Sequence, residues 1–156
     1  MKKGEILSNI ILLAVCGHHN QFDKAGLPYI LHPLKVMHYL KTNDEELQCI
    51  AIGHDLIEDT TITRLQILKA TSQRVLDGIL LLSKFEGESQ ESYENKVMSS
   101  VDATRVKLCD LRHNTDIRRL KGVTQKDIDR LNKYCKFYRK IKAKLEEVNI
   151  EGKNKG

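Results

Sequence analysis

The chain has 156 residues, a length that can enclose one hydrophobic core and that falls in the usual range of a single domain. Lys and Arg number 26 against 21 Asp and Glu, which gives a formal net charge of +5. Aromatic residues make up only 5% and there are two prolines, so strand-rich architectures have little support. No apolar run reaches transmembrane length and the first one lacks a cleavage-like site, which predicts a cytoplasmic protein without membrane association.

Apolar residues recur at helical spacing along the whole chain and predict an all-α bundle. We expect one domain over residues 1–150 and a flexible tail over 151–156. Helix starts are indicated by Thr42 to Glu45, by Thr61 or Thr63, and by Thr124 with Asp127 as a capping box. In chain order, the predicted helices cover residues 3–19, 33–41, 44–57, 62–69, 72–82, 89–100, 101–117 and 124–147.

Three of these segments carry polar residues where an apolar helix face would be buried. His32 stands at the start of the second helix, His54 and Asp55 lie in the third, and Asp110 lies in the segment RVKLCDLRHN. A buried carboxylate must be paired, hydrogen-bonded or protonated, and one shared divalent cation would satisfy all four groups. Two imidazoles and two carboxylates suit manganese, iron or zinc better than calcium. Taken singly, His32 could instead be a hydrogen-bonded residue at a helix start, and Asp110 a cap or a salt-bridge partner.

Two further acids follow the His54-Asp55 pair one helical turn later. On a continuous helix His54 shares a face with Glu58, and Asp55 shares one with Asp59. Two acids four residues apart repel each other unless a cation lies between them. Glu58 and Asp59 would then lie roughly 5–6 Å further along the helix than the metal ligands, within reach of a reacting water. This pattern indicates a hydrolytic site.

The cysteines and the basic last helix carry weaker signals. Cys16, Cys49, Cys109 and Cys135 lack C-x-x-C spacing, which argues against a zinc ribbon and predicts reduced thiols in the core. The lysines and arginines of residues 133–144 are most simply a solvated helix face. The absence of interleaved aromatic residues argues against a nucleic-acid partner, and a polyanionic small molecule explains the positive charge equally well. The sequence makes no prediction of the oligomeric state.

The run H-x-x-Q-x-x-K-x-G-x-P-Y-I-x-H-P from His18 to Pro33, followed by HDLIEDT and RVKLCDLRHN, resembles the hydrolase domain of RelA/SpoT-type enzymes. The resemblance extends to about residue 120. It implies an HD-domain helical bundle, like the stand-alone small alarmone hydrolases typified by metazoan SpoT homologues. It implies hydrolysis, not synthesis, of guanosine tetra- or pentaphosphate (ppGpp or pppGpp), with release of the 3′-pyrophosphate.

The resemblance also implies a role for each matched residue. The metal, manganese in this family with other divalent transition metals possible, would be held by His32, His54, Asp55 and Asp110. Glu58 and Asp59 would serve the catalytic water, in roles that could be exchanged. The nucleotide substrate would contact residues that are matched less specifically: Lys24, Lys107, Asn114 and Arg105.

One departure bears on the substrate. Many family members carry Arg before the motif's Lys and use it against guanine, whereas this chain has Asp23, which cannot stack on a purine as a guanidinium does. After Asp110 the Arg also stands one place later, as Arg112. Two alternatives therefore stay open. One is an HD phosphohydrolase acting on another phosphorylated nucleotide, and the other is a non-catalytic binder of nucleotides or nucleic acid.

Overall fold

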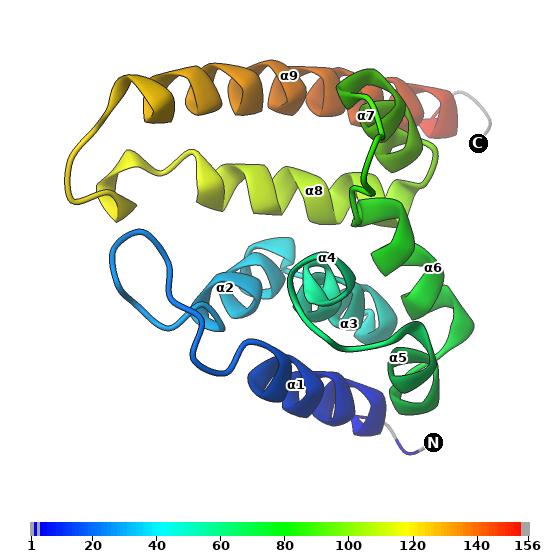
Figure 1. Cartoon of the computed structure of the whole chain (residues 1–156). Helices are drawn as coiled ribbons and strands as arrows, with labels where there is room; N and C mark the ends of the chain where they lie inside the picture. The colour runs from blue at the N-terminus through cyan, green and yellow to red at the C-terminus, as the bar shows by residue number, and fades with distance from the viewer. Residues whose placement is uncertain (1, 3, 154–156) are drawn as a thin grey trace.

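The computed structural model describes residue 2 and residues 4–153 of the chain, and within them it is a bundle of helices without a strand. Figure 1 shows that α9 and α8 run side by side above α2, α3 and α1, while α5, α6 and α7 close one end. The helices are α1 (Glu5–Gly17), α2 (Leu31–Leu40), α3 (Glu45–Gly53), α4 (Leu56–Asp59), α5 (Arg64–Ala70), α6 (Gln73–Leu82), α7 (Gln90–Met98), α8 (Val101–Asn114), the 3-10 helix η1 (Ile117–Arg119) and α9 (Gln125–Lys153).

Helix α3 is the centre of the bundle. It packs against α1, α2, α6 and α8, and its last five residues before His54 are all buried. Gly78 of α6 permits the close approach of α3, because a Cβ there would lie 2.5 Å from Cδ1 of Ile50. The core of the bundle therefore surrounds the segment that ends at His54 and Asp55.

Most helix starts are set by side-chain caps. Asp44 accepts from the Leu47 N–H at the start of α3, and Thr63 forms a capping box with Gln66 at the start of α5. Thr124 and Asp127 exchange hydrogen bonds at the start of α9. The three helix starts predicted from Thr42–Glu45, Thr63 and Thr124 are therefore confirmed.

The predicted helix over residues 44–57 is wrong in one respect, because it breaks into α3 and α4 at His54 and Asp55. In a continuous helix the Ala51 carbonyl would accept from the Asp55 N–H, but here it accepts from Nδ1 of the His54 ring, at 2.7 Å. Helix α8 likewise ends at Asn114, three residues before the predicted end. The break gives His54 and Asp55 directions that a straight helix would not allow.

Helix α9 continues to Lys153, beyond the predicted end at residue 147. The predicted flexible tail therefore includes residues 151–153, whose backbone is helical, and residues 154–156, which lie outside the described part of the chain. Cys16 and Cys135 are exposed, so the prediction of core thiols is wrong for these two, whereas Cys49 is buried. Within residues 2 and 4–153, no helix combines the length and the apolar character needed to cross a membrane.

Candidate metal centre

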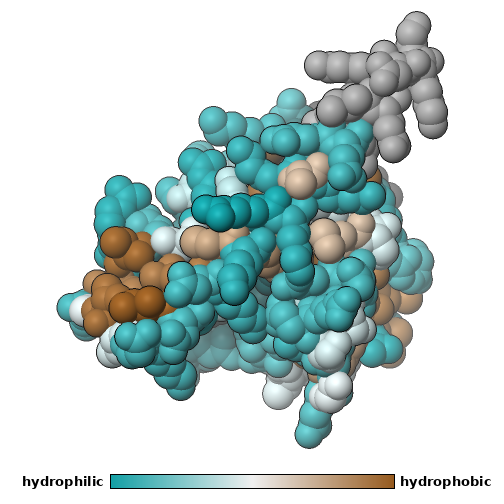
Figure 2. Space-filling model, turned by 90° about the horizontal axis from the view of Figure 1, so that it is seen from above, coloured by the Kyte–Doolittle hydropathy of each residue, from teal (hydrophilic) through white to brown (hydrophobic). Residues whose placement is uncertain are grey.

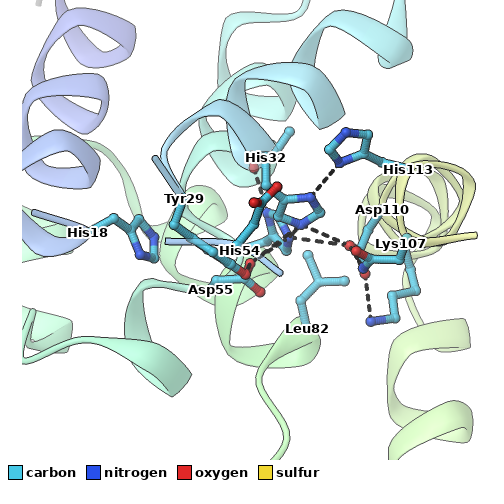
Figure 3. Close-up of polar contacts among 12 residues, drawn as sticks. His18, Tyr29, His32, His54, Asp55, Leu82, Lys107, Asp110 and His113 are labelled. Atoms are coloured by element: carbon cyan, nitrogen blue, oxygen red, sulfur yellow. Dashed lines mark hydrogen bonds and ion pairs between the residues drawn. The ribbon is translucent and has the colours of Figure 1, made fainter. Parts of the chain in front are cut away.

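Four donors predicted from separate segments meet at one point in the bundle. His32 comes from the first turn of α2, His54 and Asp55 from the break between α3 and α4, and Asp110 from the middle of α8. Figure 3 shows these side chains pointing toward one another, with dashed contacts joining them. His32, His54 and Asp110 are each 3% exposed, whereas the Asp55 side chain is 18% exposed, so the cluster is reached from solvent on the Asp55 side.

The distances between the donor atoms are short. Nε2 of His32 lies 3.2 Å from Nε2 of His54 and 3.1 Å from Oδ1 of Asp110. Nε2 of His54 lies 3.7 Å from the same Asp110 oxygen, and Oδ2 of Asp55 lies 3.1 Å from His54 Nε2 and 3.6 Å from His32 Nε2. His32, His54 and Asp110 by themselves form a group that could hold a metal ion.

This spacing fits a common ligand. Four donors about 2.1 Å from one ion lie about 3.0 Å apart at right angles and about 3.4 Å apart at tetrahedral angles. The five distances above, between 3.1 and 3.7 Å, surround those values. Two imidazole nitrogens and two carboxylate oxygens are also a donor set that binds divalent transition metals. His32, His54 and Asp110 therefore fit a divalent metal ion, and Asp55 lies beside them, within 3.6 Å of both histidine Nε2 atoms.

Other side chains hold the two carboxylates in place. The Tyr29 hydroxyl donates to Oδ2 of Asp55 at 2.6 Å. Lys107 Nζ lies 2.8 Å from Oδ2 of Asp110, and Asn114 Nδ2 donates to Oδ1 of Asp110 at 2.6 Å. Contacts of this kind orient carboxylates that bind metals. They give Lys107 and Asn114 a structural role in addition to the predicted contact with substrate.

The charges of the cluster favour a cation. Burial disfavours a charged His54, but the Asp55 and Asp110 carboxylates outweigh burial and hold the His54 pKa well above its ordinary value. Burial alone would raise the pKa of both carboxyl groups. Contacts with His54 and His32 instead lower the Asp55 pKa, and Lys107 with both histidines lowers the Asp110 pKa. The two carboxylates thus stay ionised and hold a proton on His54, a position that a metal ion would take over.

Glu58 and Asp59 lie at the mouth of the centre. They line a cavity of about 230 Å³, named here the acidic cavity, together with Asp55, Asp110 and Lys107. Oε2 of Glu58 accepts from the Lys84 N–H at 2.9 Å. Burial and the negative charges of Asp55 and Glu58 raise the pKa of Asp59 to about 6. Glu58 and Asp59 therefore share a cavity with the Asp55 and Asp110 carboxylates. Glu58 is held by a hydrogen bond from the backbone, and Asp59 has the raised pKa.

A second cavity of about 240 Å³ adjoins the acidic cavity, since Tyr29, Asn114 and Tyr134 line both. It is named here the aromatic cavity because Phe22 also lines it. The remaining lining residues are mostly charged or apolar: Asp23, Lys24, Asp116, Ile117, Arg119, Leu120, Arg130 and Leu131. Lys24 Nζ forms an ion pair of 2.8 Å with Asp127 at the start of α9. In Figure 2 the strongest hydrophobic patch lies at the left edge of a mostly hydrophilic face, with smaller hydrophobic patches elsewhere on it.

Arg105 is the one predicted site residue that the structure places elsewhere. Lys107, Asp110 and Asn114 share one face of α8, whereas Arg105 lies five positions before Asp110 and so points about 140° away. Arg105 lines neither the acidic nor the aromatic cavity. An arginine could bind a phosphate, as predicted, but the position of Arg105 on α8 directs it away from both cavities.

Several supporting residues were not predicted. His18 is buried and pairs through Nδ1 with Oε1 of Gln21, whose Nε2 in turn donates to the Asp59 carbonyl at 2.8 Å. The segment from His18 to Pro33 therefore also supports the backbone of the HDLIEDT segment. Tyr29 contacts Asp55 and His113 contacts His32 directly. Only their presence inside the matched blocks could have pointed to them.

Fold and cluster together define an HD-domain helical bundle with a candidate site for a divalent metal ion. No family model matches the chain. A solved structure of a metazoan ortholog of SpoT, described as hydrolysing ppGpp and playing a role in starvation responses, matches with a TM-score of 0.75 and 20% identity over 97% of each chain. That likeness confirms the predicted fold.

Proteins similar in sequence extend the comparison from the fold to a family of enzymes. The chain is 27% identical over 161 residues to a guanosine-3′,5′-bis(diphosphate) 3′-pyrophosphohydrolase of Haemophilus influenzae, covering 90% of this chain and 24% of the relative. It is 30% identical over 135 residues to a GTP pyrophosphokinase rsh of Brucella melitensis, covering 78% and 18%. The chain thus spans a quarter or less of the length of these relatives. The predicted resemblance to RelA/SpoT-type proteins is confirmed.

Proposed function

We propose that this chain is a metal-dependent phosphohydrolase that removes the 3′-pyrophosphate of ppGpp or pppGpp, giving GDP or GTP and pyrophosphate. The observation that carries the proposal is one cavity lined both by two of the metal donors, Asp55 and Asp110, and by two further carboxylates, Glu58 and Asp59. The activities for which the similar proteins are named support this substrate. The N/O donor set of His32, His54, Asp55 and Asp110 is compatible with Mn²⁺, the ion that the resemblance implies.

In this proposal His32, His54, Asp55 and Asp110 hold the metal. A bound divalent ion supplies positive charge to phosphoryl oxygens and lowers the pKa of water. Tyr29 fixes the rotation of the Asp55 carboxylate through its 2.6 Å hydrogen bond. Lys107 stabilises Asp110 in its charged form and presents positive charge to the acidic cavity, where a pyrophosphate would lie.

In this proposal Glu58 and Asp59 orient the attacking water and transfer its proton. Water attacks the phosphorus attached to the 3′ oxygen, the bond from phosphorus to that oxygen breaks, and the oxygen takes up a proton as a 3′-hydroxyl. A carboxyl with a pKa near 6, such as Asp59, can accept and return a proton near neutral pH. Glu58, one oxygen of which accepts from the Lys84 N–H, would orient the water.

The nucleoside would occupy the aromatic cavity, beside Phe22 and Tyr134. Lys24 and Asn114 line it and would contact the substrate there, whereas Arg105 on the other face of α8 has no part in this proposal. Basic residues of α9 line these cavities too, Arg130 the aromatic one and Lys133 the acidic one. Their position favours a small polyanion over a nucleic acid as the partner of this charge.

A second candidate is hydrolysis of another phosphorylated nucleotide by the same metal centre. The observation that favours it is Asp23, whose carboxylate lines the aromatic cavity where a family arginine would meet guanine. This candidate keeps every metal ligand and changes only the base. The released product distinguishes the two, because pyrophosphate is released from a 3′-diphosphate and phosphate from a monophosphate.

A substrate panel tests the proposal. The purified chain with Mn²⁺ is given ppGpp, 2′- and 3′-phosphorylated dinucleotides and nucleoside monophosphates, with pyrophosphate and phosphate measured separately. We expect pyrophosphate from ppGpp, loss of that product in His54→Ala and Asp55→Ala, and no loss in Asp129→Asn, which changes an exposed acid of α9. Unchanged hydrolysis in His54→Ala would show that the site is wrong. Phosphate from another nucleotide alone would favour the second candidate.

A further inference from the structure

The two histidine donors of the centre are supported in different ways. Nδ1 of His54 lies 2.7 Å from the Ala51 carbonyl oxygen. A carbonyl only accepts, so this nitrogen carries the hydrogen, and the Nε2 lone pair is left to face the other donors. The tautomer of His54 is therefore set by the backbone of α3.

The tautomer of His32 is set by another side chain. Its Nδ1 lies 2.7 Å from Nδ1 of His113. An imidazole nitrogen can donate or accept, so the pair has two arrangements. If His113 accepts, the His32 Nε2 lone pair faces the metal site. If His113 donates, His32 carries its hydrogen on Nε2, where it can donate to Oδ1 of Asp110 at 3.1 Å but occupies the place of a metal ion and faces Nε2 of His54 at 3.2 Å.

His113 is well placed to act as the acceptor. It lies one turn beyond Asp110 on α8, so the same helix supplies one ligand and the support of another. Its ring is nearly parallel to that of His32, at 18° with the centroids 5.0 Å apart, and the Tyr39 ring contacts it edge-on. Figure 3 shows His113 on the side of His32 that faces away from His54 and Asp55.

We propose that His113 is a positioning residue of the metal centre: its Nδ1 accepts from the His32 Nδ1–H and keeps the His32 Nε2 lone pair directed at the ion. The inference rests on the metal centre of the proposed function. Loss of a supporting partner of this kind lowers metal affinity by about 10- to 100-fold. His113 needs no contact with the substrate for this effect.

Two variants separate hydrogen bonding from packing. His113→Phe keeps a ring against His32 but cannot accept, whereas His113→Asn loses the ring but offers an amide oxygen near the position of Nδ1. Mn²⁺ affinity of the metal-stripped full chain is measured by competition with a chelating dye. We expect His113→Phe to bind about 10- to 100-fold more weakly and His113→Asn to stay within a few-fold of the wild type. His38→Phe, an exposed histidine of α2, serves as the control.

A spectroscopic readout follows the tautomer itself. In ¹⁵N–¹H spectra of the metal-free, histidine-labelled chain, His32 should carry its hydrogen on Nδ1 in the wild type and in His113→Asn. In His113→Phe it should shift toward Nε2. A purely structural role for His113 would leave this signature unchanged.

The outcomes distinguish the inference from the proposed function. If the wild type binds no Mn²⁺, the metal centre itself is wrong. If the wild type binds and His113→Phe binds equally well with an unchanged His32 tautomer, the metal centre stands and the inference is overturned. It is also overturned if His113→Asn loses affinity while His113→Phe keeps it, since ring packing would then be the cause. Circular-dichroism melting of each variant checks folding. If the Phe variant fails to fold, the wild-type spectrum decides, because a His32 hydrogen on Nε2 there would overturn the inference.

Discussion

Arg119 lies beside Asp23 in the aromatic cavity, with its Nη2 3.4 Å from Oδ2 of the carboxylate. Asp23 uses its other oxygen to accept from the N–H groups of Ala25 and Leu27. Burial opposes the charge of Asp23, but these hydrogen bonds and Arg119 outweigh burial and lower its pKa. A guanidinium is thus present in this cavity although the sequence carries Asp at the family's Arg position.

This relationship predicts that Arg119 contributes to nucleotide binding. Arg119→Met should raise the KM for ppGpp by about 10- to 100-fold, the equivalent of one hydrogen bond to a charged group of about 1.5–3 kcal/mol, with a smaller change in kcat. Steady-state kinetics checks the prediction. Arg118→Met is the matched control, because the Arg118 side chain is 86% exposed and pairs with Asp116. Equal KM values for the two variants would contradict it.

Ionised Asp59 is expected to lower the folding stability of the chain, although its carboxyl group serves the reaction. Its pKa is about 6 in the folded chain and near 3.8 without the fold, so stability falls as the pH rises between these values and stays lower above pH 6. Asp59→Asn should therefore abolish most hydrolysis but raise the melting temperature of the metal-free chain at pH 8 and leave it nearly unchanged at pH 4.

Melting curves at the two pH values test this prediction about Asp59. Asp129→Asn, on the exposed face of α9, controls for the general loss of a carboxylate. A change in melting temperature of the same size at pH 4 and pH 8 would mean that Asp59 is not under repulsion from Asp55 and Glu58.

Metal binding should release a proton from His54. The carboxylates of Asp55 and Asp110 raise the His54 pKa in the metal-free chain, and a metal ligand must be deprotonated. Mn²⁺ affinity is therefore expected to increase as the pH rises, until His54 is already deprotonated without metal. Titration calorimetry at pH 7 in buffers of different ionisation enthalpy measures the protons released. Affinity that falls between pH 6 and pH 8 would contradict this assignment.

Gly78 is predicted to be essential for the packing that holds His54 in place. An added Cβ would lie 2.5 Å from Cδ1 and 2.9 Å from Cγ1 of Ile50, which is fully buried in α3. Gly78→Ala should therefore destabilise the fold by about 1–3 kcal/mol through overpacking, although alanine favours helices by about 1 kcal/mol. Urea unfolding measures the change. Gly122→Ala, with open space around the new Cβ, should have little effect.

The sequence predicted the helices and the convergence of four donors well, because both depend on strong local patterns. Apolar periodicity sets the helices, and a buried carboxylate such as Asp110 needs a partner wherever it lies. The break at His54 was missed because the ring competes for the Ala51 carbonyl, a contact that no spacing rule contains. The prediction of one helix over residues 44–57 therefore identified His54 and Asp55 but missed the break between α3 and α4 that directs their side chains.

Contacts between distant segments account for most of what the sequence left out. Lys24 pairs with Asp127, which lies 103 positions away, and His113 supports His32 across 81 positions. Each of these side chains has an ordinary surface or helix interpretation in its own segment. Arg105 shows the converse, since its charge indicated a phosphate contact and only its place on α8 shows that it points elsewhere.

The most direct test of the account is hydrolysis of ppGpp by the metal-stripped chain with and without added Mn²⁺, with GDP, pyrophosphate and phosphate separated by chromatography. We predict GDP and pyrophosphate in equal amounts, only when Mn²⁺ is present, and none from Asp110→Asn under the same conditions. Unchanged ppGpp in a sample shown to bind Mn²⁺ would contradict the proposed substrate. Hydrolysis that proceeds equally with Asp110→Asn would contradict the metal centre itself.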